Sequence, residues 1–269
     1  EPGDKFHNMF RMQSFSFKKS CMPLEPHCQK DFWMSNPPTK GDNPSPAVTT
    51  ELSLHCCIRW LAGGSCHDIG NHVGVSVATF HACKNLITDA IPQCPQLGMK
   101  FLTTEEALLE TSASFCKIST DGIISACAGC VDGPLLKMMT PSLKETGNVK
   151  ACHSDHHSTC GINIQGVCDS SCWFTHIAVV TPGGHNDCRA CEESDLPALV
   201  DALPTGAHII GDNACPVSEK LLTPFSGAEA HEKLKSNYNF FVSQCRTRIE
   251  MAFGRLVNKW RIFEDTASC

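Results

Sequence analysis

Four short apolar segments between residues 123 and 211 restrict the fold of this chain more than any other feature. Each is too short for a typical helix, and the pattern of the second alternates as a β-strand does. They are residues 123–131, 161–169, 174–180 and 207–211. A polar turn at Ser170-Ser171 would join the second and third as a hairpin, and a helix is predicted after Ser194. Three strands, a helix, a fourth strand and a late helix predict a mixed α/β domain.

The late helix is predicted over residues 246–261. Its apolar residues recur at four-three-four spacing, which makes one stripe on a helix, and Glu250 lies at the edge of that stripe. The stripe consists of Ile249, Phe253, Leu256 and Trp260, and the basic residues expected to contact DNA are Arg246, Arg248, Arg255 and Lys259. A basic helix with one acid at its border suits work on a polyanion. Taken alone, the pattern is more often an amphipathic helix with a solvated charged face.

Three short helices are predicted further upstream, within residues 49–95. Ser65 and Ser76 are placed to cap the second and third helices, and Gly74 separates the two. A helix, a turn and a capped helix form a helix-turn-helix-like arrangement, whose last helix would enter a DNA major groove. Only Arg59 and Lys84 supply positive charge inside this unit, so its composition gives weak support for DNA binding.

The pattern therefore predicts four regions along the chain. Residues 1–48 are an N-terminal segment that ends in a Pro-, Gly- and Asn-rich linker, and residues 49–95 are the helix-turn-helix-like domain. Residues 96–120 are a connector with a helix near residues 104–112, and residues 121–269 are the α/β domain. The first residue is Glu1, which leaves open whether the chain is a fragment.

Composition excludes several classes of protein. The chain has 269 residues, 42% of them hydrophobic and 19% charged, which is typical of a globular protein. A net charge of −6 argues against a basic nucleic-acid binder, so any DNA contact must depend on local patches. No apolar run approaches the roughly 20 residues of a membrane-spanning helix, and no secretory signal is visible.

Nineteen cysteines are unusual for a chain of this length. Two C-x-x-C pairs, Cys127/Cys130 and Cys188/Cys191, and a His/Cys cluster over residues 152–160 contain the ligand types that zinc accepts. Cys127 and Cys130 fall in a predicted buried strand, however, where the tight turn of a zinc knuckle is difficult to place. We therefore favour free thiols, and keep a zinc-binding interaction protein as a third hypothesis.

Three acids occupy positions that are typical of an active site. Asp132 and Asp212 end predicted buried strands, and side chains there project from the edge of a sheet. With Glu250 they would form a cluster of carboxylates, which repel one another unless a cation neutralises them. Hard oxygen ligands select Mg²⁺ or Mn²⁺, and two such ions can drive the cleavage of a phosphodiester. Each acid taken singly is more often a cap, a turn former or a surface charge.

Four ordered blocks between about residues 120 and 263 carry a resemblance to a known family. They are Ala128-Gly-Cys-Val-Asp132-Gly133, Thr181-Pro-Gly-Gly-His-Asn-Asp187, Gly211-Asp212-Asn-Ala-Cys-Pro216 and Arg246-Thr-Arg-Ile-Glu250-Met-Ala-Phe-Gly-Arg-Leu256. They closely resemble the PIF/Harbinger-type transposases of the DDE endonuclease superfamily. The last block is long, which makes the resemblance specific, and the upstream helices fit the usual layout of the family.

The resemblance implies an RNase H-like mixed sheet flanked by helices, with Asp132, Asp212 and Glu250 as the catalytic triad. Asp187, in the His-Asp loop of the family, would add a fourth metal ligand. Such enzymes cut DNA at element ends and join the 3′-hydroxyl to target DNA, using Mg²⁺ or Mn²⁺. A separate DNA-binding partner protein is usual in the family, oligomeric state is open, and a DNA substrate implies the nucleus.

This chain also departs from the family pattern. Cys191, Cys215, His157 and Cys160 stand where aromatic or basic residues are usual. Our hypothesis is a drifted copy that keeps the triad but has eroded packing. The alternative to an active nuclease is a catalytically silent, transposase-derived module that binds DNA or protein.

Overall fold

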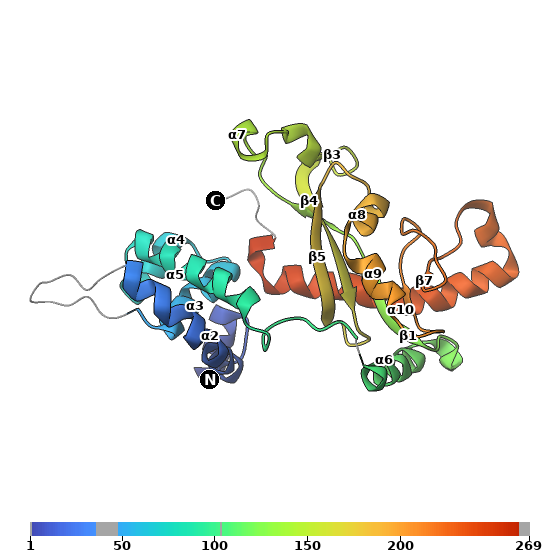
Figure 1. Cartoon of the computed structure of the whole chain (residues 1–269), viewed down its shortest axis with the longest axis horizontal. Coiled ribbons are helices and arrows are strands. Elements are labelled where there is room, and N and C mark those ends of the chain that lie inside the picture. Colours follow the sequence, from blue (N-terminus) through green and yellow to red (C-terminus); the bar gives the residue numbers. More distant parts are fainter. Residues whose placement is uncertain (1, 36–47, 103, 264–269) are drawn as a thin grey trace, which may run out of the picture. The chain divides into compact units, whose positions relative to one another are not determined.

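The computed structural model describes residues 2–35, 48–102 and 104–263 (Figure 1). The chain divides into two compact units. The first comprises Glu1–Gly98 and Val257–Asp265, and the second comprises Met99–Leu256 with Thr266–Cys269. The predicted linker falls almost entirely on residues 36–47 and lies outside the described residues. Among the described residues, no helix is both long and apolar enough to cross a membrane.

The first unit consists of helices. These are α1 (Pro2–Phe10), α2 (Ser14–Ser35), α3 (Thr50–Leu61), α4 (Cys66–Val73), α5 (Val77–Ala90) and the 3₁₀ turns η1 (Ile91–Gln93) and η5 (Arg261–Phe263). The three helices predicted upstream are confirmed as α3 to α5. The Ser65 hydroxyl accepts a hydrogen bond from the Asp68 N–H, the Ser76 hydroxyl accepts one from the Thr79 N–H, and Gly74 ends α4 in a left-handed conformation.

Two helices of this unit lie in the segment that the sequence pattern left without structure. Helices α1 and α2 contribute Phe10, Phe17 and Leu24 to a core that also holds Leu54 of α3. Trp260 packs against the same core, so the last residue of the predicted apolar stripe serves the first unit. The units therefore differ in extent from the predicted regions, because one long helix carries the chain from the second unit back into the first.

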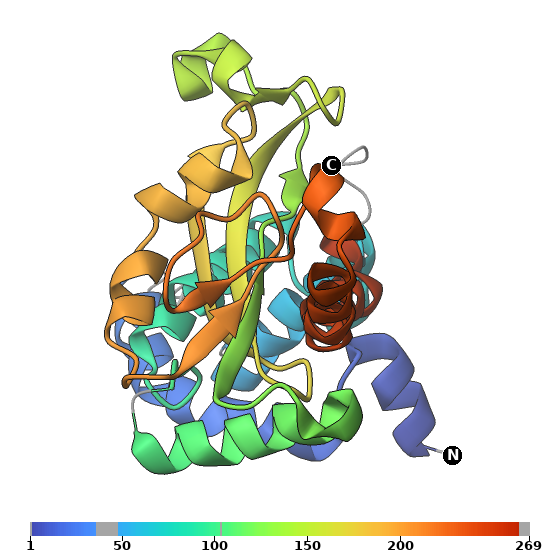
Figure 2. The same cartoon turned by 90° about the vertical axis from the view of Figure 1, so that its right-hand side faces the viewer.

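The second unit is built on a mixed sheet. Its strands are β1 (Cys127–Asp132), β2 (Leu135–Lys137), β3 (His153–Ser154), β4 (Thr159–Cys168), β5 (Phe174–Pro182), β6 (His208–Ile210) and β7 (Leu221–Leu222). Strand β4 pairs antiparallel with β1, β2, β3 and β5, whereas β1, β6 and β7 run parallel to one another (Figure 2). This arrangement confirms the predicted mixed α/β fold and agrees with the RNase H-like fold of the resembled family.

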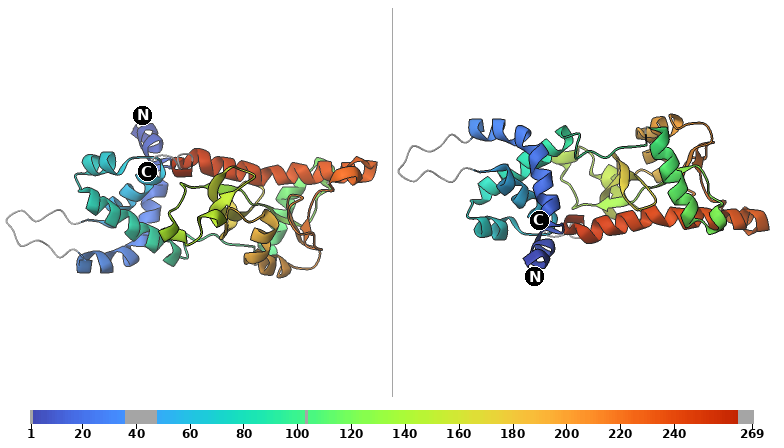
Figure 3. Two further views of the ribbon diagram at one scale, coloured as in Figure 1. Left: turned by 90° about the horizontal axis from the view of Figure 1, so that it is seen from above. Right: turned by 90° about the horizontal axis from the view of Figure 1, so that it is seen from below.

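Helices flank this sheet. They are α6 (Glu105–Ile118), α7 (Leu143–Thr146), α8 (Asp187–Glu193), α9 (Leu196–Asp201) and α10 (Lys233–Lys259), with 3₁₀ turns η2 (Thr120–Gly122), η3 (Val149–Cys152) and η4 (Gly227–His231). Helix α10 runs along one side of the sheet (Figure 3). It starts thirteen residues before the predicted position at residue 246. Its first turns extend the apolar stripe through Tyr238, Val242 and Cys245, which pack in the same core as Ile249 and which the prediction missed.

The two faces of the sheet contribute to different cores. Cys130 of β1 and Ile210 of β6 pack with α10, in a cluster that includes Ile249. Their neighbours Val131 and Ile209 belong to a second cluster, which also contains residues of α9. Since successive side chains of a strand point to opposite faces, each residue at the end of β1 or β6 can be assigned to one side of the sheet.

Candidate functional site

Asp132 and Asp212 lie at matching positions on two neighbouring strands. Cys130 and Ile210 are partners in the parallel β1–β6 register. Asp132 lies two residues after Cys130, and Asp212 lies two residues after Ile210. Two residues along a strand return to the same face, so Asp132, at the end of β1, belongs to the α10 side of the sheet. Asp212 lies just beyond the end of β6, so the fold brings these two predicted site residues to the same edge.

The carboxyl group of Asp132 is partly buried and surrounded by charge. Burial raises its pKa above the ordinary value, a hydrogen bond from the Gly133 N–H (2.9 Å) lowers it, and the nearby charges of Asp212 and Glu250 raise it further. Arg246 acts in the opposite direction and lowers the pKa of this carboxyl. The pKa of Asp132 thus depends on the charges of both other predicted acids and of one arginine of α10.

Helix α10 is held close to the sheet by contacts on either side of Glu250. The Cys130 thiol donates a hydrogen bond to the Cys245 carbonyl oxygen (3.2 Å), and Ile249 is fully buried. On β4, a Cβ atom at Gly166 would lie 2.6 Å from the ring of Phe253, so only glycine permits this approach. Glu250 follows Ile249 at the border of the packed surface, where 47% of its side chain is exposed.

Glu250 is not a free carboxylate in this structure. Arg246, one turn earlier on α10, forms an ion pair with its Oε1 atom. Among the described residues, no three His, Cys, Asp or Glu side chains form a group that could hold one metal ion. The donor chemistry nevertheless fits a hard divalent cation, because all three predicted ligands are carboxylates, and burial together with the charges of Asp212 and Glu250 disfavours the charged form of Asp132.

The four cations predicted to contact DNA do not lie together. At about 100° per residue, Arg246 is about 40° from Glu250 around the helix axis, whereas Arg248 and Arg255 are about 140–160° from it. Arg255 donates a hydrogen bond to the Ser171 carbonyl oxygen (2.8 Å) in the β4–β5 hairpin. In the first unit, the Lys259 ammonium lies 5.2 Å from the centre of the Trp260 ring. Arg246 alone of the four adjoins the carboxylates.

The His-Asp loop leads from β5 into α8. Strands β1 and β5 are both antiparallel to β4, so their carboxyl ends point the same way. Asn186 caps α8 by accepting a hydrogen bond from the Arg189 N–H, and the helix begins at Asp187, where a loop was expected. The side chain of Asp187, the fourth predicted ligand, lies outside the described side chains.

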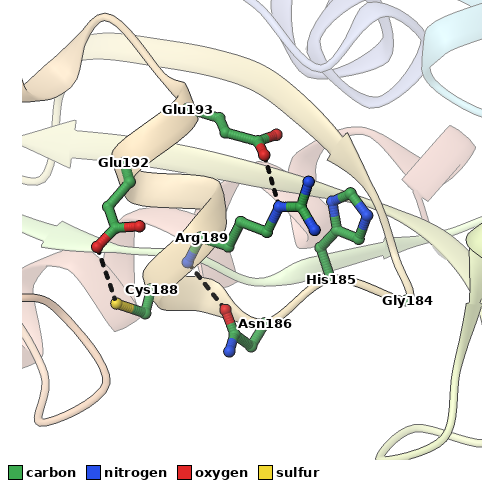
Figure 4. Close-up of a pocket in the computed structure, with 7 residues that line it drawn as sticks. All are labelled: Gly184, His185, Asn186, Cys188, Arg189, Glu192 and Glu193. Carbon is green, nitrogen blue, oxygen red and sulfur yellow. Dashed lines mark hydrogen bonds and ion pairs between the residues drawn. The ribbon is translucent and has the colours of Figure 1, made fainter.

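A cavity of about 480 Å³ opens beside this loop (Figure 4). It is lined by Gly184, His185, Asn186, Cys188, Arg189, Glu192 and Glu193. Arg189 is paired with Glu193, and the Cys188 thiol donates to Glu192, so its charged groups largely satisfy one another. The sequence pattern gave no sign of this cavity, because it depends on how α8 folds back after β5.

One buried side chain beside the site was not predicted. Gln165 of β4 is 1% exposed, and neither polar atom of its amide has a hydrogen-bond partner among the described residues. A Cβ atom at Gly133 would lie 2.1 Å from the amide nitrogen of Gln165, so the backbone just after Asp132 passes directly over it. The available signal was a glutamine two residues after Asn163 in a strand that is otherwise mostly apolar.

The cysteine clusters are distributed through the fold. Cys127 and Cys130 are buried in β1. Cys188 and Cys191 both belong to α8, where Cys191 is buried and Cys188 is half-buried. Burial raises the pKa of Cys191 to about 11, and the neighbouring Cys188 and Glu192 add to that shift. The described cysteines are free thiols.

Comparison with known proteins gives two findings. Residues 131–268 match the family model of the DDE superfamily endonuclease. The chain is also 22% identical over 271 residues to "Protein ALP1-like" of Arabidopsis thaliana, covering 96% of this chain and 63% of that protein. The chain thus spans less than two thirds of the length of this relative. No solved structure gives a significant match.

Proposed function

Because the chain belongs to the DDE superfamily endonucleases, we propose that it is a divalent-metal-dependent DNA nuclease of the Harbinger transposase type. Asp132, Asp212 and Glu250 are its catalytic carboxylates, and Mg²⁺ or Mn²⁺ is its cofactor. The observation that carries the proposal is the electrostatic environment of Asp132, because the charges of Asp212 and Glu250 both raise the pKa of its carboxyl group. The charges of residues from the end of β6 and from α10, far apart in the sequence, act on this residue of β1, and this supports the proposal.

In the proposed mechanism the three carboxylates would hold the divalent cations, with Asp187 as a further ligand. When bound, the metal ions would activate a water or a 3′-hydroxyl and stabilise the leaving oxygen of the phosphodiester. The Gly133 N–H orients the carboxylate of Asp132 through a hydrogen bond, and the packing of Ile249 fixes the position of Glu250. The guanidinium of Arg246 is suited to a phosphate oxygen at the same edge.

The other predicted basic residues would contact DNA away from the cut phosphate. Arg248 and Arg255 lie on the opposite border of α10, and Lys259 belongs to the first unit. The α3–α5 helices carry few cations, which supports the proposal that a separate DNA-binding protein helps to recruit the substrate. A DNA substrate in turn supports a nuclear location.

A second candidate function is a catalytically silent module that binds DNA or protein. The ion pair between Arg246 and Glu250 favours it, because a glutamate that stays paired cannot serve as a metal ligand. The two candidates differ in whether any divalent ion enters the site.

Incubation of the protein with labelled duplex DNA and Mg²⁺ or Mn²⁺ tests the choice. The nuclease proposal predicts metal-dependent strand cleavage that is lost in Asp132→Asn, Asp212→Asn and Glu250→Gln. Asp201→Asn, a change at an exposed acid at the end of α9, is the matched control and should retain cleavage. DNA binding without cleavage by the wild-type protein would favour the silent module.

A further inference from the structure

Arg246 occupies an unusual place for a basic residue in a carboxylate site. Its guanidinium is ion-paired with Glu250, and its charge also acts on Asp132. Among the described residues it is the cation that faces this group of acids, since Arg248 lies on the other border of α10. Three quarters of the Arg246 side chain is shielded from solvent (27% exposed), so the pair is screened less than one on an open surface.

We infer that Arg246 is an internal counter-ion that competes with the divalent metal for Glu250 and releases it when a DNA phosphate takes over the arginine. This inference rests on the proposed function and concerns how the site is loaded. The protein alone then binds metal weakly, and DNA completes the metal site.

The chemistry of the two partners makes this exchange feasible. A guanidinium presents a planar pair of N–H donors that fits a carboxylate or a phosphate equally well, so one side chain can move between the two. Arg246 and Glu250 are four residues apart on one helix, so the arginine can release the acid by a change of rotamer, without movement of α10. A phosphate brought to this edge attracts the guanidinium, while the freed carboxylate gains a divalent cation.

The exchange has a thermodynamic consequence. If DNA raises the affinity for the metal by some factor, the metal must raise the affinity for DNA by the same factor. The strength of the Arg246–Glu250 ion pair limits how much the metal affinity can change. Partly exposed pairs of this kind change an equilibrium by about two- to fivefold, and this is the expected change in metal affinity when Arg246 is neutralised.

Titration of the full chain with Mn²⁺, followed by the loss of the free-ion electron paramagnetic resonance signal, tests the inference. Arg246→Gln should bind Mn²⁺ about two- to fivefold more tightly than the wild type in the absence of DNA. Lys235→Gln is the matched control, because it removes another cation of α10 that is 27% exposed and ion-paired, with Glu229 and Glu232. It should leave the Mn²⁺ affinity unchanged.

Two further measurements separate competition from a simple change of charge. A short DNA duplex should tighten Mn²⁺ binding by the wild type and have little effect on Arg246→Gln. In a Glu250→Gln background, Arg246→Gln should lose more than half of its effect, because the arginine then has no ligand to withhold. Circular dichroism melts confirm that each variant is folded.

The possible failures are distinguishable. If the wild type binds Mn²⁺ and Arg246→Gln binds it equally or more weakly, the inference is wrong and the proposed function stands. A duplex that tightens Mn²⁺ binding equally in the wild type and in Arg246→Gln would also overturn it. If neither protein binds Mn²⁺ with or without DNA, the proposed function fails together with the inference.

Discussion

Cys130 and Ile210 are direct partners in the parallel β1–β6 pair, and each lies two residues before an aspartate of the site. This pairing, more than any contact between the acids themselves, sets Asp132 and Asp212 side by side. The Cys130 thiol also bonds to the backbone of α10, so the same residue ties the strand to the helix that carries Glu250. Cys130, which takes no part in the proposed reaction, thus contacts both β6 and α10, the two segments that carry Asp212 and Glu250.

Neutralising Asp132 should stabilise the metal-free fold. In Asp132→Asn the amide oxygen can still accept the Gly133 hydrogen bond, while the buried negative charge beside Asp212 and Glu250 is removed. We expect a higher melting temperature than wild type at pH 7 without metal, at about 2–4 °C for each kcal/mol gained in a protein of this size.

The pH dependence of that gain follows from the raised pKa of Asp132. The folded state binds this proton more tightly than the unfolded state, so stability falls as pH rises from the unfolded pKa through the folded one. The wild-type penalty is therefore complete above the folded pKa, shrinks between the two pKa values and is absent below the unfolded pKa. Melts from pH 7 down to pH 4 should show the advantage of Asp132→Asn shrinking, and an advantage that grows on acidification would contradict the assignment.

Gln165 offers a second test of the structure around Asp132. Both polar atoms of its amide lack partners within the part of the chain that the structure describes, and a buried unsatisfied polar group costs about 1–3 kcal/mol. Gln165→Met, which keeps the length of the side chain and removes the amide, should raise the free energy of unfolding in urea. The control is Gln244→Met, which removes an amide that does bond to Thr120 and should lower it.

The packing of α10 predicts a third result. Phe253 is 9% exposed and fills the space above Gly166, so Phe253→Ala should cost about 3–5 kcal/mol of stability. Phe240, on the same helix, is 55% exposed, and Phe240→Ala should change stability by less than about 0.5 kcal/mol. Equal effects of the two substitutions in urea denaturation would show that α10 does not pack on the sheet through Phe253.

The hypothesis of a drifted copy predicts low stability. Cys191 and Cys215 are buried in the cluster on the α9 side, where the resembled family tends to have larger side chains. Lost packing of this kind costs roughly 2–4 kcal/mol per site, against a total stability of about 5–15 kcal/mol. A calorimetric scan should give a midpoint below about 50 °C, and a cooperative transition well above it would argue against erosion.

Local signals explain what could be predicted from the sequence. Ser65 and Ser76 identify helix starts because a cap depends on a few adjacent residues, and the predicted bounds of α4 and α5 agree closely with the structure. Asp132 and Asp212 were recognisable because each directly follows a short apolar strand. The β4–β5 hairpin was recognisable from its alternation and its polar turn.

The remaining features depend on contacts between distant segments. Helix α2 has a weak apolar pattern interrupted by Pro23 and Pro26, and it is stabilised by packing that its own sequence does not show. The difference between Arg246 and Arg248 depends on which side of α10 faces the sheet. The ion pair of Arg246 with Glu250 follows from their i, i+4 spacing on one helix, so it was readable in the sequence, although the prediction assigned Arg246 only to DNA.

Cleavage of the protein backbone by bound iron is the most direct test of the shared metal site. Fe²⁺ with ascorbate and peroxide generates radicals where the ion is held, and the fragments identify the segments around it. With a DNA duplex present, we predict cuts near residues 132, 212 and 250 that excess Mg²⁺ suppresses and that Asp132→Asn and Asp212→Asn abolish. Fragments from only one of these segments, or cuts that Mg²⁺ does not suppress, would contradict a common site for the three carboxylates.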